Sequence, residues 1–164
     1  MRRIICRREL VADDARYAGE PAAPDTRLVQ PASQFIAALG SGQASAAGDA
    51  VVIGPTDEVE ALVPHLALLD LIVVDFPKIG EGRGFSQARM LRQRYRFRGE
   101  LRARGMIGRD QLFFLARCGF DSFDLMAGEN LEAALGALDA FSVAYQDGSD
   151  ALVHVRRRAA PASA

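Results

Sequence analysis

The sequence contains few of the residues on which disulfide-rich, metal-binding and membrane proteins depend. Its 164 residues include two cysteines and two histidines, too few for a disulfide scaffold, and their positions do not match the spacing of a zinc ribbon. No apolar stretch approaches the length of a membrane span, and the basic start of the chain is not followed by the apolar core of a signal peptide. We therefore expect a cytoplasmic protein without a metal, a cofactor or a membrane partner.

The overall composition is that of an ordinary globular protein. Hydrophobic residues make up 49% of the chain and charged residues 25%, which argues against global disorder. The length suits one domain with a substantial core, but it is too short for a complete eightfold α/β barrel. The formal net charge of −1 by itself favours neither a nucleic acid nor a membrane surface as partner.

The small net charge conceals a strong asymmetry along the chain. Residues 78–117 hold eleven cations against three acids, a net charge of +8, so the rest of the chain carries −9. Such a block is typical of a surface for anions or a charged partner, and a solvated helix face is the alternative. Tyr95 and Phe97 stand among these arginines, but aromatic residues do not alternate with the basic ones as in a platform for single-stranded nucleic acid, so that partner is not favoured.

The chain divides into three parts by composition. Residues 1–49 alternate short apolar pieces with Pro-, Gly- and Ala-rich stretches, which predicts a small N-terminal β unit and a flexible connection. Residues 50–146 alternate strand-like and helix-like segments, which predicts an α/β domain, and residues 147–164 have the composition of a frayed tail. Within the first part, residues 13–25 are expected to form a loop.

The regular alternation after residue 50 predicts the fold class. Four strand–helix units in succession imply right-handed crossovers and a mostly parallel sheet. Both a partial barrel similar to a TIM barrel and an open flavodoxin-like sheet fit this pattern. The expected strands are 51–53, 71–76, 100–104 and 121–125, and the expected helices lie near 59–66, 86–95, 110–118 and 131–141.

Ligands of parallel α/β folds bind beyond the carboxyl ends of the strands, which directs attention to Asp75 and the glycine-rich loop behind it. A backbone rich in glycine approaches an anion closely, and an arginine adds a fork of donors. We therefore expect anion binding by Arg83, Gly84, Ser86 and Arg89. The loop matches neither a dinucleotide fingerprint nor a Walker loop, and an ordinary glycine loop capped by Ser86 is the alternative.

Two further positions are candidates for chemistry. Alternation along residues 100–104 separates Arg102 from the apolar face of that strand, so its guanidinium needs an acid or a bound anion. An ion pair with Asp75 and a direct role in binding or catalysis are the two interpretations. Asp110 follows at the start of a helix, where it is either an N-cap or a catalytic acid. Asp75, Arg102 and Asp110 are thus the candidate catalytic residues.

Residues 71–125 carry a distinctive set of short motifs. They include Asp75-Phe76-Pro77, the run GRGFSQAR at residues 82–89, the run GELRA at 99–103, and the runs RDQLFF and RCGFD at 109–114 and 117–121. With these motifs the chain resembles the bacterial domain-of-unknown-function family 934, whose members are often labelled probable oxidoreductases. Met106 stands where the family pattern has an acid, and no flavin, nicotinamide or iron–sulfur motif accompanies the label.

The resemblance implies a context rather than a reaction, because members of the family are commonly encoded beside assimilatory sulfite reductase. The first expectation is an accessory protein that contacts sulfite reductase or another sulfate-assimilation enzyme, with charge complementarity guiding the contact. The alternative is a small barrel-like enzyme that acts on an anionic metabolite containing sulfur or phosphate. A partial barrel also leaves sheet edges that a second copy can cover, so a homodimer is a further expectation.

Overall fold

The structure is a computed structural model, and it describes residues 2–21, 26–42 and 48–140. Its strands are β1 (Arg3–Cys6), β2 (Glu9–Ala12), β3 (Ala15–Tyr17), β4 (Arg27–Pro31), β5 (Asp49–Ile53), β6 (Leu69–Phe76), β7 (Glu100–Gly105) and β8 (Ser122–Asp124). Its α-helices are α1 (Ala32–Gly40), α2 (Arg83–Arg89), α3 (Leu112–Cys118) and α4 (Leu131–Ala140). Two 3-10 helices, η1 (Val59–Leu68) and η3 (Arg109–Gln111), and a π-helix, η2 (Met90–Arg94), complete the described elements.

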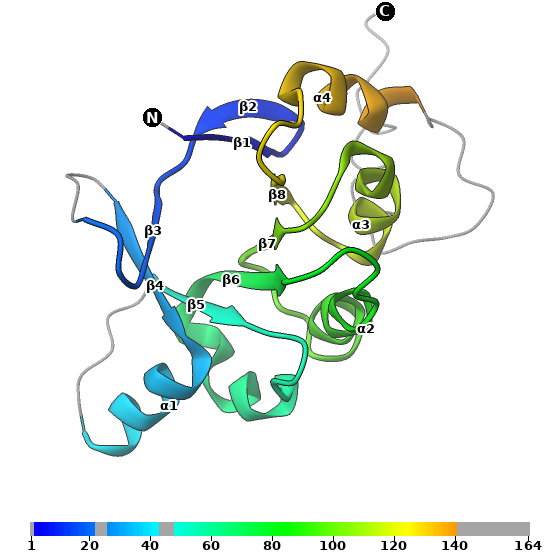
Figure 1. Ribbon diagram of the computed structural model, residues 1–164. Coiled ribbons are helices and arrows are strands. Elements are labelled where there is room, and N and C mark those ends of the chain that lie inside the picture. The colour runs from blue at the N-terminus through cyan, green and yellow to red at the C-terminus, as the bar shows by residue number, and fades with distance from the viewer. Residues whose placement is uncertain (1, 22–25, 43–47, 141–164) are drawn as a thin grey trace, which may run out of the picture.

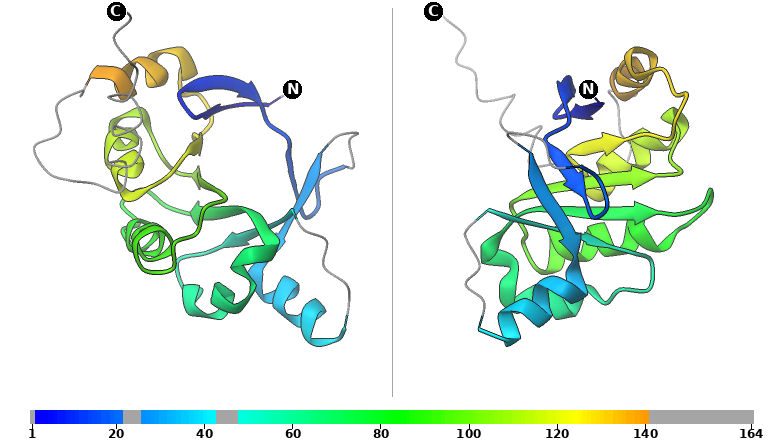
Figure 2. Two further views of the ribbon diagram at one scale, coloured as in Figure 1. Left: turned by 180° about the vertical axis from the view of Figure 1, so that it is seen from behind. Right: turned by 60° about the vertical axis from the view of Figure 1, so that its left-hand side comes forward.

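The eight strands form one curled sheet in the order β2-β1-β8-β7-β6-β5-β4-β3. The pairs from β3 to β8 are parallel, whereas β1 pairs antiparallel with both β2 and β8. The predicted mostly parallel α/β sheet is therefore confirmed, with antiparallel strands at one edge. The sheet bends into a half-barrel rather than lying open, and the helices lie along its outer side (Figure 1). The two views in Figure 2 show the same arrangement from behind and from the side.

The two edges of this sheet are consecutive pieces of one extended segment. Strand β2 forms one edge, β3 forms the other, and only Asp13 and Asp14 separate them in the chain. The amide of Asp13 donates to the carbonyl of Arg2 at 2.9 Å, which extends the pairing with β1. The carbonyl of Asp14 accepts from the amide of Arg27 at 2.8 Å, which extends the pairing with β4. The segment thus links both edges and closes the curl on that side.

Alternation along the strands divides the interior into two regions. On β6, Ile72, Val74 and Phe76 face outward and belong to the large core beneath the helices, while Leu71 and Val73 face inward. The inward cluster is small and otherwise contains residues of β3, β4 and β5. The helices therefore cover an apolar outer face, and the inner face of the half-barrel holds a small apolar cluster and, elsewhere, polar side chains.

Two predicted elements differ from the structure. Residues 13–25 are not only a loop, because Ala15–Tyr17 form β3 and pair with β4. The helix expected from Ser86 begins at Arg83 and continues as the π-helix η2. The predicted tail, residues 147–164, lies outside the described residues. Among the helices that the structure describes, none is long and apolar enough to cross a bilayer.

Candidate functional site

Strand β7 carries the charged residues of the inner face. Leu101 and Ala103 point outward into the core, and Glu100, Arg102 and Arg104 occupy the alternate positions. This is the alternation expected from the sequence. The inner face consequently holds a charged group at each level of β7, from the amino end of the strand to its carboxyl end.

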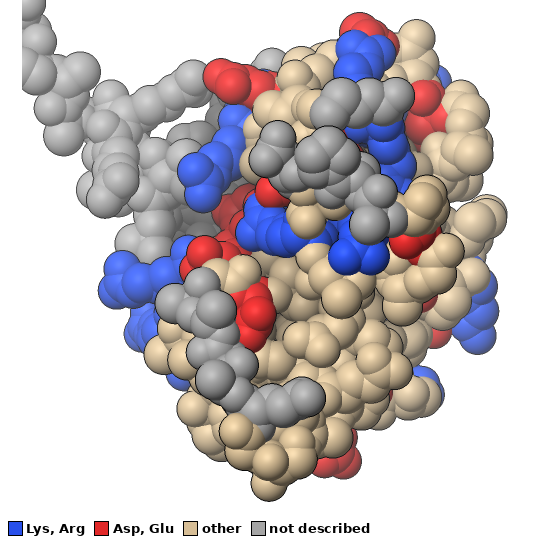
Figure 3. Space-filling model, turned by 90° about the vertical axis from the view of Figure 1, so that its left-hand side faces the viewer, with Lys and Arg blue, Asp and Glu red and all other residues tan. Residues whose placement is uncertain are grey.

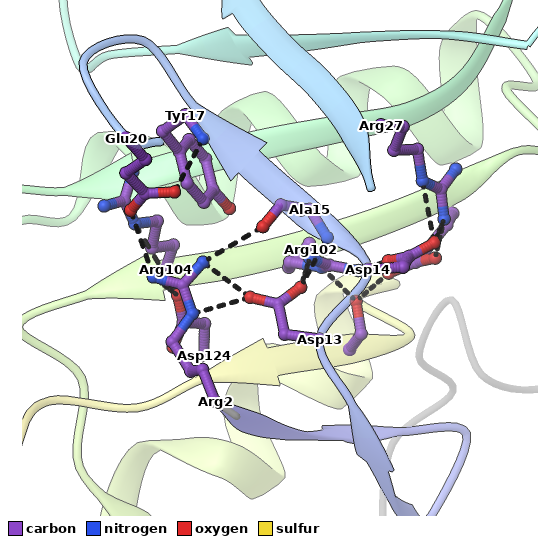
Figure 4. A network of polar contacts seen from close by, with 12 residues as sticks. Arg2, Asp13, Asp14, Ala15, Tyr17, Glu20, Arg27, Arg102, Arg104 and Asp124 are labelled. Carbon is purple, nitrogen blue, oxygen red and sulfur yellow. Dashed lines mark hydrogen bonds and ion pairs between the residues drawn. The ribbon is translucent and has the colours of Figure 1, made fainter. Parts of the chain in front are cut away.

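Arg102 is fully buried and surrounded by carboxylates. Its side chain is 1% exposed, its Nη1 lies 2.7 Å from Asp13 Oδ1, and its Nη2 lies 2.8 Å from Glu100 Oε1 and 3.3 Å from Asp14 Oδ1 (Figure 4). Burial alone would lower the pKa of Arg102, but the charges of Glu100 and Asp13 outweigh it and raise that pKa above its ordinary value. The guanidinium therefore stays charged and joins β7 to the β2–β3 link.

Other side chains complete this group, here called the inner ion-pair network. Ser122 Oγ donates to Glu100 Oε1 at 2.5 Å, and Arg27 Nη2 lies 2.7 Å from Asp14 Oδ2. Partial burial raises the pKa of Asp14, but the charge of Arg27 and hydrogen bonds from Arg27 and Arg102 give a net lowering. Arg102 Nε also donates to Glu100 Oε1 at 3.0 Å, so all three guanidinium nitrogens are occupied by the protein itself and the network has a structural role.

The prediction of an ion pair between Asp75 and Arg102 is wrong. Within the described part of the chain, Arg102 pairs with the carboxylates of the network and not with Asp75. The register explains the difference, because Val73 lies opposite Arg102 on the neighbouring strand and Asp75 lies opposite Arg104. Sequence reasoning also missed Asp13 and Asp14, whose only signal was a pair of acids between short apolar pieces.

A second set of charges lies nearer the carboxyl ends of the parallel strands. Asp75 of β6 is paired in register with Arg104 of β7, which is paired with Asp124 of β8. All three strands present these residues on the inner face, since they alternate with outward core residues. We call Asp75, Arg104 and Asp124 the carboxyl-end row. It lies at the edge of the sheet where parallel α/β proteins bind ligands.

Two side chains hold the guanidinium of Arg104, Asp124 at its Nε edge and Tyr17 against its planar face. Its Nε lies 3.6 Å from Asp124 Oδ2, and its guanidinium carbon stands 3.5 Å from the centre of the Tyr17 ring. This is close cation–π geometry. Its side chain is 30% exposed, and among the described residues its two Nη groups donate no hydrogen bond. The arginine is thus fixed in place while its terminal donors are free for a ligand.

Arg2 joins the row to the network. Its Nη2 lies 2.6 Å from Asp13 Oδ2, and its Nη1 lies 3.6 Å from Glu20 Oε1 and 3.9 Å from Asp124 Oδ2. Burial raises the pKa of Asp124, and the charge of Arg2 opposes that rise. Sequence analysis gave Arg2 no role, because a basic residue next to the start of the chain is not distinctive. Figure 3 shows how closely cations and acids intermingle over the middle and upper part of the β3–β4 side.

Asp75 has a different environment from Asp124. It is half-buried, and within the described residues its carboxylate takes part in no hydrogen bond or ion pair. Partial burial raises the pKa of Asp75, and the charge of Arg104 opposes the rise without cancelling it. Asp75 is therefore a carboxyl group with a shifted proton affinity and free oxygens, positioned beside an arginine with free donors.

The glycine-loop residues lie at a separate place. Arg83 and Ser86 line an open groove of about 320 Å³ between α2 and the loop before η1. Asp57, Glu58 and Glu60 line the same groove, so acids outnumber the one arginine. The expected anion site at this loop stays a prediction, and the charge of the groove does not favour it.

Three of the predicted anion-binding residues do not line this groove, namely Gly84, Arg89 and Arg102. A Cβ on Gly84 would stand 2.5 Å from Cζ of Phe76, so this glycine permits close packing of α2 on β6. Glu81 Oε1 accepts from the amide of Arg83 at 3.2 Å, so the protein supplies its own anion there. Arg89 is exposed on α2. Arg102 lies in the inner network, so the five residues do not converge on one site.

Gln87 is a groove residue that the sequence analysis missed. Its Nε2 donates to the carbonyls of Gly54 and Asp57, each at 2.9 Å, and its buried Oε1 has no partner among the described residues. Asp57 is not the N-cap of η1, and its Oδ2 accepts from the amide of Gly54 at 2.7 Å. Gln87 therefore ties α2 to the loop before η1.

Asp110 does not form the expected N-cap. The helical turn begins after Gly108, whose amide donates to Gln111 Oε1 at 3.2 Å, and Asp110 is exposed within that turn. The structure places Asp110 outside both the network and the row. Among the described residues, no group of three His, Cys, Asp or Glu side chains has the arrangement of a metal site.

These features define an α/β half-barrel protein with a buried inner ion-pair network and a partly buried row of charges near the carboxyl ends of its strands. The family model for bacterial proteins of unknown function, DUF934, matches residues 50–154, and the chain belongs to this family. The match confirms the resemblance and includes the whole carboxyl-end row, while Asp13 and Asp14 precede it. No curated protein matches the chain.

Proposed function

We propose that the protein binds a small molecule with an anionic group at the carboxyl-end row and transfers a proton to or from it. The observation that carries this proposal is that Asp75 lies opposite Arg104 on the neighbouring strand. Within the described chain, the carboxylate oxygens of Asp75 accept no hydrogen bond, and the Nη groups of Arg104 donate none. An arginine with two parallel donors suits a carboxylate, sulfonate, sulfate or phosphate group. Asp75 is adjacent and suits the role of general acid–base, because partial burial raises its pKa above the ordinary value of an aspartate.

Arg104 is well prepared for this role. Its Nε faces Asp124 at 3.6 Å and its face lies against Tyr17, so little side-chain freedom is left to lose when a ligand binds. The resemblance to a family encoded beside sulfite reductase makes sulfur-containing anions the first group to examine. Two free cysteines, Cys6 and Cys118, agree with a reducing, cytoplasmic setting for such a protein.

The test is a thermal-shift and calorimetric screen of the purified protein with sulfite, sulfate, phosphate and adenylylated sulfur compounds. We expect at least one anion to raise Tm, and we expect Arg104→Gln to abolish that rise. Arg83→Gln is the matched control, since Arg83 is exposed at the groove, and it should bind like the wild type. The proposal fails if no anion binds, or if Arg83→Gln removes binding and Arg104→Gln does not.

A second candidate function is that of an accessory protein for sulfite reductase or another sulfate-assimilation enzyme. It is favoured by exposed apolar side chains on two segments that follow parallel strands. Ile79, after β6, is 72% exposed and Met106, after β7, is 40% exposed. The amide of Met106 donates to the carbonyl of Phe76 at 2.7 Å, which brings the two segments together. Lys78 and Arg109 are exposed on the same segments, so an acidic partner surface would be complementary.

This second candidate is tested by pull-down and native mass spectrometry with the cognate sulfite reductase at low salt. We expect a complex that weakens as salt increases, and we expect the double variant Ile79→Ser, Met106→Ser to abolish it. Phe114→Ser is the control, because Phe114 is 61% exposed on α3 and outside these two segments. Absence of a complex at low salt would contradict an accessory role with this partner.

A further inference from the structure

The charges around the carboxyl-end row do not balance. Two guanidiniums approach Asp124, from Arg104 at 3.6 Å and from Arg2 at 3.9 Å, so its charge is compensated. Asp75 has only the neighbouring charge of Arg104, with no direct contact among the described residues. A ligand that carried only negative charge would bind Arg104 and leave Asp75 both unpaired and repelled.

A buried hydroxyl group next to the row is also without a partner. Tyr17 is 6% exposed, and its hydroxyl oxygen forms no hydrogen bond within the described chain. Figure 4 shows its ring against Arg104 on the inner side of the half-barrel, and the hydroxyl lies within the influence of both cations and acids, namely Arg102, Arg104, Asp124 and Asp13. A buried hydroxyl is seldom left unpaired. Its position points to a polar ligand group that is held between β3 and the row.

We infer that the ligand of the carboxyl-end row is a zwitterion of the amino-acid type, with its anionic group on Arg104 and its protonated amine on Asp75. This inference rests on the proposed function and specifies its substrate class. Neighbouring strands are separated by about 4.8 Å, so groups on Asp75 and Arg104 can contact adjacent ends of one small molecule. The Tyr17 hydroxyl is then available to the anionic group as a further donor.

The row is well matched to such a ligand. The ammonium group would supply Asp75 with the opposite charge that the protein does not provide, and the carboxylate or sulfonate would fill the free Nη positions of Arg104. Asp124 is already compensated by Arg2 and Arg104, so it would keep Arg104 oriented without competing for the amine. The ammonium of the ligand would thus pair with Asp75, and its anionic group would pair with Arg104.

The experiment uses pairs of probes that share an anion and differ in the amine. The pairs are L-alanine with propionate, taurine with ethanesulfonate, and phosphoethanolamine with ethyl phosphate, each titrated calorimetrically into the full chain. For at least one pair we expect the amine-bearing member to bind about tenfold more tightly, as befits a hydrogen bond to a charged group. Arg104→Gln should remove binding of both members, and Tyr17→Phe should weaken both without changing their ratio.

Asp75→Asn is the decisive variant. It should reduce binding of the amine-bearing member about tenfold and leave or improve binding of its partner, so that the preference disappears. Asp75→Ser repeats the test without the amide, and urea unfolding verifies that both variants fold. Equal binding within every pair, or a preference that survives in Asp75→Asn, would overturn the zwitterion and leave anion binding at Arg104 intact. If neither these probes nor the inorganic anions bind, the proposed function fails together with it.

Discussion

At the scale of single residues, the structure treats two arginines of one strand in opposite ways. Arg102 is enclosed by carboxylates from β7 and from the β2–β3 link, so its charge serves the fold. Arg104, two residues further, is held by Asp124 and Tyr17 but keeps its terminal donors for a ligand. The difference comes from the position of each arginine along β7. Asp13 and Asp14 of the link contact Arg102 in the middle of the strand, and they do not contact Arg104 near its carboxyl end.

Replacing Arg102 by methionine should destabilise the protein strongly. The methionine would fill much of the same space, but the buried Asp13 and Glu100 would lose Arg102 and keep only Arg2 and Arg27 as their cations. Removing one partner of a buried ion pair costs about 3–5 kcal/mol, and we expect a loss of that size in urea unfolding. Arg98→Ala, at an exposed position, should change stability by less than about 0.5 kcal/mol. A loss below about 1 kcal/mol in Arg102→Met would show that the network contributes little.

The raised pKa of Asp75 predicts a dependence of stability on pH. An ordinary aspartate has a pKa of about 3.9, and burial places the folded-state value above that, with Arg104 opposing. The folded protein therefore binds more protons than the unfolded chain between these two values. This contribution to stability is largest below the ordinary pKa and is lost as pH rises through the folded-state pKa.

Asp75→Asn removes this titration and should be more stable than the wild type at pH 7. The advantage should shrink as pH falls through the folded-state pKa of Asp75 toward the ordinary pKa of aspartate. Urea midpoints of both proteins, measured from pH 3.5 to 8, give the difference directly. A constant difference across that range would contradict a raised pKa at this position.

At the scale of elements, helix α2 depends on the absence of a side chain at Gly84. A Cβ there would stand 2.5 Å from Cζ of Phe76, so Gly84→Ala must displace either α2 or the aromatic ring. Overpacking of this kind costs about 1–3 kcal/mol. Gly136→Ala is the matched control, because no atom lies within 4 Å of its Cβ position on α4. That substitution should stabilise by up to about 1 kcal/mol, and thermal unfolding should show the two opposite signs.

The elements with a clear hydrophobic pattern were predictable from the sequence. The continuous apolar run of β6 and the alternation in β7 both led to the correct strands and faces. Strand β3 was not predictable, because three residues between acidic and Pro-rich stretches carry little pattern, and its partner β4 lies ten residues further along the chain. It pairs with β4 at the edge of the curled sheet opposite to β2, although only two residues separate β2 and β3 in the chain.

The candidate site was predictable only in part, for the same physical reason. Asp75 was identified from its place after a buried strand, and the inward direction of Arg102 followed from alternation. Which acid meets which arginine depends on register and on the path of the β2–β3 link, and neither is encoded locally. Arg104 and Asp124 became partners of Asp75 only because β6, β7 and β8 are neighbours in register.

At the scale of the whole molecule, the opposing charge blocks neutralise each other partly within the fold. Arg92 donates to the carbonyls of Gly119, Phe97 and Gly99 and pairs with Asp121. Arg102 and Arg104 likewise pair with acids outside the basic segment, among them Asp13 and Asp124. The opposite charges of the two blocks therefore meet inside the fold as well as at the surface. Lys78 and Arg83 of the same block are exposed, and they belong to the surface.

The closure of the half-barrel by the β2–β3 link leads to a prediction for the molecule as a whole. Asp13 is the centre of this closure, since its Oδ1 lies 2.7 Å from Arg102 Nη1 and accepts from the amide of Ala15 at 2.9 Å, while its Oδ2 accepts from Arg2 Nε at 2.7 Å. Asp13→Ala removes all three contacts and so loosens the connection between β3 and β7, which then rests on Asp14 beside Arg102 and on Tyr17 beside Arg104. The strands β5, β6 and β7 keep their pairing and their outer core.

Hydrogen exchange followed by mass spectrometry should therefore show a regional response to Asp13→Ala. Amides of β2 and β3 should exchange faster by at least about tenfold, because a lost charged hydrogen bond is worth about 1.5–3 kcal/mol. Amides of β6 should change much less, since opening of the link leaves that strand paired on both sides. Asp110→Ala, at an exposed position, should leave all regions unchanged. Equal acceleration of β3 and β6 would mean that the half-barrel opens only as a unit, and that the link is no more than one part of a single cooperative fold.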